Sequence, residues 1–129
     1  MLVNGILNPQ INSLLARVRH TNLLVIADRG FPYWPMVETV DISLVDGVPT
    51  VLQVFKAINL NFAIHEIIMA QEFLDVNSLD VCEAFAEALG NCPITHEPHI
   101  ELKKRVSTAV GLIRTGDTIQ YANMILVSG

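Results

Sequence analysis

The chain has 129 residues and a formal net charge of −5 at pH 7; 51% of its residues are hydrophobic and 16% are charged. Because domains of about 100 to 150 residues are the commonest, the length predicts one domain over residues 1–129, and the apolar excess predicts a homo-oligomer whose contacts cover it. The 8 basic residues are too few for a nucleic-acid partner, and no apolar run approaches the roughly 18 residues that a membrane helix needs.

The first half of the chain predicts a helix followed by two strands. Asn8 is a natural N-cap, Pro9 suits the first helical position, and the apolar residues that follow recur with helical spacing. Residues 23–27 are uniformly apolar and branched, which indicates a central strand covered on both faces. After a loop that holds the only tryptophan, Trp34, we expect a second strand at residues 37–44.

The middle of the chain predicts two helices around a strand. Thr50 can cap a helix that continues to about residue 58, and Ser78 can cap another that Gly90 ends. The intervening apolar stretch, residues 62–70, is expected to be a strand, and a helix stays possible there.

The last third predicts a helix, stopped by Gly116, and a closing apolar strand over residues 121–129. The basic cluster at 103–105 fits the solvated face of that helix. Its apolar face would consist of Leu102, Val106, Ala109, Val110 and Ile113. This alternation implies an α/β fold: a single three-layer domain with a largely parallel or mixed central sheet and helices on both faces.

His20 and Asp28 flank the central strand and are candidates for chemistry. If residues 22–27 are extended, the two side chains lie roughly 20 Å apart, so one chain cannot bring both to one substrate. Either each has a separate local role, or a neighbouring subunit brings its own copy of one beside the other. Taken alone, His20 could simply complement a helix dipole and Asp28 could form a turn, although a carboxylate at the end of a central strand lies where α/β sheets bind ligands.

A second group of polar residues lies later in the chain. His96 and His99 suggest a metal, but Pro98 between them prevents the helical spacing of a zinc protease, so no metal is expected. If a helix has begun by residue 99, His99 and Lys103 share one of its faces.

Tyr121 and Asn123 alternate along the predicted last strand and would point to one side, about 7 Å apart. The sequence holds no G-x-S-x-G elbow, P-loop or G-x-G-x-x-G motif, so acyl transfer, nucleotide hydrolysis and dinucleotide chemistry have no support.

Four motifs occur in a characteristic order: H-T-N before the central strand, D-R-G-F-P after it, H-x-x-L-K in the last third, and R-T-G-D-x-x-x-Y-A-N-M-I-L at the end. Together they resemble the D-ribose pyranase and L-fucose mutarotase family over nearly the whole chain. The resemblance implies a ring-shaped homo-oligomer with a monosaccharide bound near subunit contacts. It also implies an isomerase that interconverts cyclic forms of a free ribose-like or fucose-like sugar without a cofactor.

The resemblance also implies roles for individual residues. His20 corresponds to the catalytic histidine, which would transfer protons when the sugar ring opens and closes. The sugar-binding positions correspond to Asp28, His99, Lys103, Tyr121 and Asn123.

Two departures from the family pattern leave alternatives open. Asn22 replaces the usual aspartate, which keeps a non-catalytic sugar-binding or regulatory accessory protein of carbohydrate uptake as the alternative function. The bulky loop around Trp34 could instead stack on a different sugar.

The two cysteines, Cys82 and Cys92, have no spacing that suggests disulfides, and the N-terminus does not resemble a secretory signal. We therefore expect a cytoplasmic protein with both thiols reduced.

Overall fold

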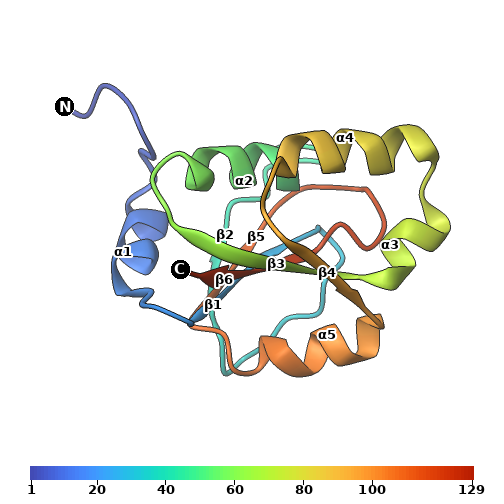
Figure 1. Cartoon of the computed structure of the whole chain (residues 1–129). Coiled ribbons are helices and arrows are strands. Elements are labelled where there is room, and N and C mark those ends of the chain that lie inside the picture. The colour runs from blue at the N-terminus through green and yellow to red at the C-terminus, as the bar shows by residue number, and fades with distance from the viewer.

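The computed structural model describes all 129 residues and forms one six-stranded sheet in the order β2-β5-β1-β6-β3-β4, flanked by five helices (Figure 1). The strands are β1 (Leu23–Ala27), β2 (Glu38–Asp41), β3 (Ile64–Ala70), β4 (Ile94–Glu97), β5 (Gly111–Arg114) and β6 (Met124–Ser128). The helices are α1 (Pro9–Arg17), α2 (Val51–Asn59), α3 (Gln71–Val76), α4 (Leu79–Leu89) and α5 (His99–Val106).

The sheet is mixed because β6 runs against its neighbours. β1 pairs in parallel with β5, β5 with β2, and β3 with β4, whereas β6 is antiparallel to both β1 and β3. The central position of β1 is confirmed: Val25 pairs with Leu112 on one side and with Ile125 on the other. Five strands therefore end at one edge of the sheet, where β6 begins.

Helices cover both faces of this sheet, which confirms the predicted three-layer α/β fold. Figure 1 shows α2 and α4 on one side of the sheet and α5 on the other. Successive residues of β1 pack alternately on the two faces of the sheet. Leu24 and Ile26 pack with α1, α2 and α4, while Val25 and Ala27 pack with α5. The uniformly apolar sequence of β1 follows from this burial on both faces.

Three predicted helix starts are confirmed by their caps. The Oδ1 of Asn8 accepts the Ile11 N–H at 2.9 Å, and the Ser78 hydroxyl accepts the Val81 N–H at 3.3 Å. Thr50 and Gln53 form a reciprocal capping box at the start of α2.

The predicted last helix was wrong beyond its first two turns. α5 ends at Val106, and residues from Gly111 to Arg114 form β5, which is buried between β1 and β2. Short apolar runs fit helical and extended spacing equally well, and burial on both faces decides here for the strand. The short α3 and β4 were not predicted at all.

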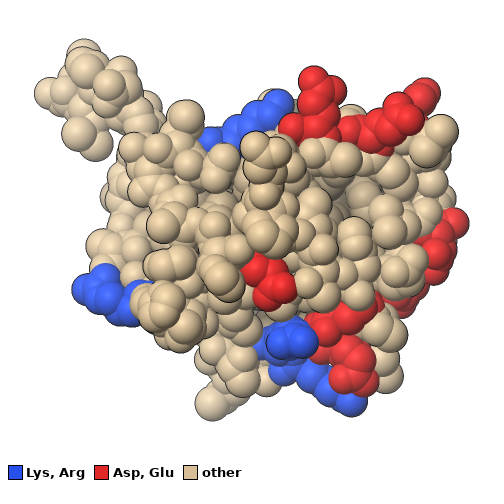
Figure 2. All heavy atoms as spheres, in the orientation of Figure 1, with Lys and Arg blue, Asp and Glu red and all other residues tan.

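Charged side chains on the face seen in Figure 2 form small groups of both signs, and no broad basic field appears there. The predicted solvated basic face of α5 is confirmed, because Lys104 pairs with Glu101 at 2.9 Å and Arg105 with Glu97 at 2.6 Å. None of the helices has the length and hydropathy that crossing a membrane requires.

Candidate active site

A small cavity lies at the edge of the sheet where the parallel strands end. Asp28 directly follows β1, His99 opens α5 just after β4, and Asn123 directly precedes β6. Crevices at the carboxyl ends of strands are the usual ligand sites of α/β sheets. The cavity measures about 300 Å³, at the small end of the range for small-molecule sites. It is lined by Asp28, Gly30, Phe31, Pro32, His99, Gln120, Tyr121 and Asn123.

Two larger hollows, of about 450 and 570 Å³, lie along the edge strand β2. Their charged side chains already pair with each other: Arg114 with Asp41 at 3.0 Å, and Arg17 with Glu38 at 2.7 Å. The smaller cavity instead brings together a carboxylate, an imidazole, a phenol and two amides, so it is the better candidate for chemistry.

Asp28 is held at its strand end by main-chain hydrogen bonds. Its N–H donates to Oδ1 of the buried Asn123 at 2.7 Å, and its Oδ1 accepts the Gly30 N–H at 2.9 Å. Burial raises the pKa of the Asp28 carboxyl, and the hydrogen bonds from Gly30 and Asn123 oppose that shift. The predicted turn role and the predicted cavity position therefore apply to the same residue.

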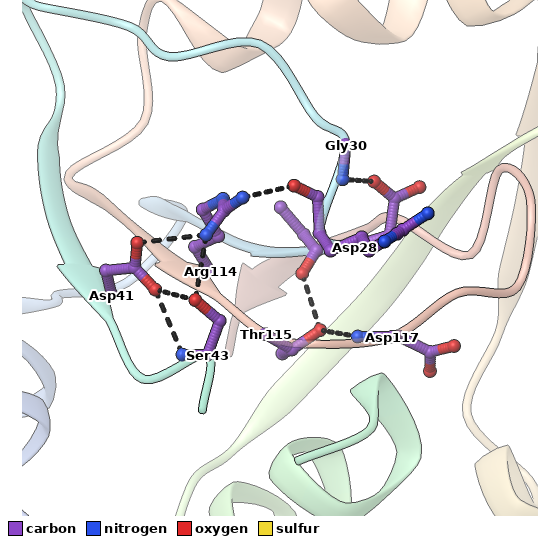
Figure 3. Close-up of polar contacts among 9 residues, drawn as sticks. Asp28, Gly30, Asp41, Ser43, Arg114, Thr115 and Asp117 are labelled. Carbon is purple, nitrogen blue, oxygen red and sulfur yellow. Dashed lines mark hydrogen bonds and ion pairs between the residues drawn. The ribbon is translucent and has the colours of Figure 1, made fainter. Parts of the chain in front are cut away.

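The main chain on both sides of Asp28 is fixed by the R-T-G-D stretch that begins at the last residue of β5 (Figure 3). The Ala27 carbonyl accepts the Thr115 N–H at 2.9 Å and the Thr115 hydroxyl at 2.8 Å. The Arg29 N–H donates to the Asp117 carbonyl at 3.0 Å.

Arg114 completes this support from β5. Its Nη2 donates to the Arg29 carbonyl, while its Nη1 donates to Asp41 Oδ2 at 3.0 Å and Ser43 Oγ at 2.8 Å (Figure 3). Arg114 thus ties the turn that carries Asp28 to the end of β2.

The buried Asp117 has a structural role. Its Oδ2 accepts the Val51 N–H at 2.8 Å, which supplements the cap of α2, and its Oδ1 accepts the Ile119 N–H at 2.8 Å. A carboxylate is favoured at the start of a helix because it complements the helix dipole.

His99 forms the opposite wall of the cavity. Its ring meets Tyr121 edge-on at 5.0 Å between centroids and Phe31 at 6.0 Å, and its Nδ1 is buried without a hydrogen-bond partner. Burial lowers the pKa of His99 below 6.5, Lys103 lowers it further, and Glu72 and Asp28 oppose the shift. The imidazole is therefore mainly neutral near pH 7 and keeps one ring nitrogen that can accept a hydrogen bond.

The structure brings Tyr121 and Asn123 to the cavity, but the predicted reason was wrong. Both precede β6, so they do not alternate along a strand, and Tyr121 has a φ of 57°. A bulky residue in this left-handed region is uncommon, and such residues concentrate at functional sites.

His20 and Lys103 are not among the residues that line the cavity. His20 is exposed in the turn before β1, at the opposite edge of the sheet from Asp28. Lys103 is half-buried one turn along α5 from His99, so the predicted helical spacing of these two residues is confirmed.

Sequence reasoning missed Phe31, Gln120 and Glu72. Phe31 is part of the D-R-G-F-P motif and Gln120 directly precedes Tyr121, so the motifs could have indicated both. Glu72 contacts His99 across 27 positions of sequence, and no local pattern predicts that contact. Trp34 packs against the apolar cluster beneath α5 and is not part of the cavity lining. No group of three or more His, Cys, Asp or Glu side chains is arranged to hold a metal ion.

Comparison with known proteins agrees with the resemblance seen in the motifs. The model of the RbsD / FucU transport protein family matches residues 1–129. The chain is 40% identical over 129 residues to a D-ribose pyranase of Geobacillus kaustophilus, covering 100% of this chain and 94% of that protein. It is 35% identical over 129 residues to a D-ribose pyranase of Clostridium botulinum, covering 100% of this chain and 98% of that protein.

Solved structures show the same fold. The structure of Bacillus subtilis RbsD complexed with D-ribose has a TM-score of 0.90 at 31% identity, covering 100% of this chain and 98% of that one. The fucose mutarotase of Streptococcus pneumoniae, in complex with L-fucose, has a TM-score of 0.75 at 20% identity, covering 95% and 92%. With the family model matched from end to end, the chain belongs to the RbsD / FucU family.

Proposed function

We propose that this protein is an isomerase that interconverts the cyclic forms of a free, ribose-like monosaccharide by proton transfer. The observation that carries the proposal is the convergence of Asp28, His99, Tyr121 and Asn123 around one cavity of about 300 Å³. The relatives named D-ribose pyranase and the structure of a relative with D-ribose bound support the substrate class.

The cavity offers what a polyhydroxylated ring requires. The Asp28 carboxylate can accept hydrogen bonds from sugar hydroxyls, and the imidazole of His99 and the hydroxyl of Tyr121 add two further polar groups to the cavity lining. These groups would hold the ring by several hydrogen bonds, while the edges of Phe31 and Pro32 supply apolar contact.

Ring interconversion then needs only two proton transfers. Opening a cyclic hemiacetal removes the proton of the anomeric hydroxyl and adds one to the ring oxygen as the bond between that oxygen and the anomeric carbon breaks. Closure by a different hydroxyl, or on the other face of the carbonyl, reverses these steps. A histidine with a pKa near neutrality can give and take such protons, with a typical gain of about 10² to 10⁴ in rate. We assign this role to His20.

We further propose that His20 reaches the cavity from a neighbouring subunit. Within one chain it lies at the far edge of the sheet from Asp28, so an adjoining copy must present it, head to tail. Thr21, directly after His20, has a φ of 68°, a strained value for a β-branched residue of the kind found at functional sites. Head-to-tail contacts that close produce rings.

Exposed apolar side chains support this packing. Several follow the strands that end at the cavity edge and would be covered by the next subunit. They are Tyr33 and Met36 after β1, Leu44, Val45 and Val48 after β2, Leu74, Val76 and Leu79 after β3, and Ile100 after β4.

The replacement of the usual aspartate by Asn22 is compatible with this function. The Oδ1 of Asn22 accepts the Arg19 N–H at 2.9 Å, which closes the turn that contains His20. An aspartate would offer the same acceptor oxygen, so this contact does not require the negative charge. We place the reaction in the cytoplasm, where the thiols of Cys82 and Cys92 would stay reduced.

NMR saturation transfer on D-ribose and other free pentoses and 6-deoxyhexoses tests the proposal. The protein should accelerate exchange between ring forms, and His20→Ala should lower that rate about 10²-fold or more. His65→Ala, which removes another exposed histidine, is the matched control and should exchange sugar at the wild-type rate. Sugar binding with no acceleration of exchange would overturn the proposal and favour a non-catalytic accessory protein.

A further inference from the structure

The short helix α3 contacts both walls of the cavity without lining it. It leaves β3 at the edge of the sheet where the cavity lies. Two polar side chains, Glu72 within the helix and Asn77 at its C-cap, reach other segments of the chain. Neither contact is explained by the folding of α3 itself.

The first contact joins Glu72 to His99. Both carboxylate oxygens of Glu72 lie within hydrogen-bond distance of the His99 N–H, at 3.0 and 3.1 Å. The residue at the N-cap of α5 is Pro98, which provides no side-chain cap. Glu72 therefore caps α5 from another helix and fixes the residue whose ring faces the cavity.

The second contact joins Asn77 to the segment before Tyr121. The Nδ2 of Asn77 donates to the Gln120 carbonyl at 2.9 Å and to the Phe73 carbonyl at 2.9 Å. It thereby ties the end of α3 to the main chain next to Tyr121, where φ is 57°.

We infer that α3 and its C-cap residue set the placement of His99 against Tyr121, with Glu72 and Asn77 as positioning residues for sugar binding. This inference rests on the proposed function. The two rings it positions meet edge-on at 5.0 Å between centroids, and each lines the cavity. A shift of either wall would misplace its polar atoms relative to the sugar.

The contact between Glu72 and His99 also affects the pKa of the His99 ring. Three charged groups act on His99: Lys103 from α5, Glu72 from α3 and Asp28 from the turn after β1. Glu72 opposes the lowering of the His99 pKa by burial and by Lys103. Removing the Glu72 charge should therefore lower the pKa of His99 further, an effect that a purely structural loss elsewhere would not produce.

Three variants and one control separate the positioning of the cavity walls from the effect of the Glu72 charge on the His99 pKa. Glu72→Gln keeps an acceptor oxygen and removes the charge, Glu72→Ala removes both, and Asn77→Ala removes the second contact. The control is Asp75→Asn on the same helix, where the exposed carboxylate contacts only the Gln71 side chain, at 3.3 Å.

The readouts are D-ribose affinity by calorimetry, KM and kcat for ring exchange, and the NMR titration of His99. Glu72→Ala and Asn77→Ala should each weaken affinity and raise KM about tenfold, the loss expected if a displaced wall costs the sugar about one hydrogen bond, with kcat changed less than about threefold. Glu72→Gln should keep most of the affinity at pH 8 and, like Glu72→Ala, titrate His99 at lower pH than the wild type. Asp75→Asn should match the wild type in all three.

The inference would be overturned if His99 titrated in both Glu72 variants as it does in the wild type. It would also be overturned if Asp75→Asn lost as much affinity as Glu72→Ala. If the wild-type protein fails to exchange sugar forms, the proposed function falls, whereas the His99 titration still tests the Glu72 contact. If Glu72→Ala does not fold, the titration of Glu72→Gln decides.

Discussion

The main-chain N–H of Asp28 donates a hydrogen bond to Oδ1 of Asn123, 2.7 Å away and 95 positions later in the sequence. Both residues line the cavity, and Asn123 is only 2% exposed. The contact joins the end of β1 to the start of the antiparallel β6, so it fixes the turn that carries the carboxylate. Asn123 is thus part of the cavity wall and also a support for Asp28.

Asn123→Ala should destabilise the fold and weaken sugar binding together. The substitution leaves the part-buried Asp28 N–H without its acceptor, which should cost about 1 kcal/mol, near the low end of the range for a buried donor. Chemical denaturation with and without D-ribose measures both effects. The control is Asn12→Ala, an exposed amide that donates to the Ile6 carbonyl, with an expected change within about 0.5 kcal/mol. Equal stability losses in the two variants would contradict the support role of Asn123.

Asp28→Asn should stabilise the fold at neutral pH and lower activity. Burial raises the pKa of Asp28 in the folded protein above its unfolded value, so its contribution to stability is present below the ordinary Asp value of 3.8 and is lost as pH rises through the raised folded pKa. The side-chain amide of asparagine carries no charge, so the variant avoids the free-energy cost of burying an ionised carboxylate. Thermal melts from pH 3 to 8 should therefore show a higher Tm for the variant near pH 7, and sugar exchange should fall about 10²-fold or more.

The control for this prediction is Glu87→Gln, which removes an exposed carboxylate on α4. Its melting profile should follow that of the wild type across the pH range. A lower Tm for Asp28→Asn near pH 7 would show that the ionised carboxylate stabilises the fold instead.

Arg114→Ala should loosen the turn after β1. Arg114 donates to the Arg29 carbonyl, Asp41 and Ser43, and hydrogen bonds from charged groups contribute about 1.5 to 3 kcal/mol each when buried. Because the side chain is 34% exposed, we expect a total loss of about 1 to 2 kcal/mol.

A matched control is Arg17→Ala, whose ion pair with Glu38 is about half exposed and should contribute less to stability than the contacts of Arg114 do. Urea unfolding gives the free energies, and KM for D-ribose should rise only in Arg114→Ala. A wild-type KM in that variant would mean that Arg114 does not hold the Asp28 turn.

Gly116→Ala should disturb the segment between β5 and β6. A Cβ at this position would lie 2.4 Å from the Val45 carbonyl oxygen and 2.6 Å from that of Val48, so the main chain would have to move. Overpacking of this kind typically costs about 1 to 3 kcal/mol. At Gly30 a Cβ would meet only Asp28 Oδ1, at 3.7 Å, so Gly30→Ala should change stability by less than about 0.5 kcal/mol. Similar Tm values for the two variants would contradict the packing at Gly116.

The fold could be predicted where local signals and burial agree. The caps at Asn8, Thr50 and Ser78 and the apolar run of β1 gave correct elements, because side-chain hydrogen bonds and two-sided burial leave a clear local pattern. The segment after Val106 was assigned wrongly, because its apolar spacing fits both helix and strand. Only the pairing of β5 between β1 and β2 decides that case, and such pairing is not encoded locally.

Four of the residues that line the cavity could be predicted from the sequence, but their geometry could not. Asp28, His99, Tyr121 and Asn123 meet in one cavity, whereas the predicted strand placement of Tyr121 was wrong. The Glu72 cap of α5 depends on the relative position of two helices, which a single sequence does not specify. The roles assigned to His20 and Lys103 stay predictions.

If each site combines His20 of one subunit with Asp28 of its neighbour, as proposed, two inactive variants should complement each other in mixed assemblies. His20→Ala and Asp28→Asn subunits should each be nearly inactive, and co-expression at equal levels should restore exchange at about a quarter of the sites, since random assembly pairs one intact His20 with one intact Asp28 that often. Saturation transfer on D-ribose measures the recovery. Mixed assemblies, verified by tagged co-purification, that exchange D-ribose no faster than either variant alone would contradict a site shared between subunits.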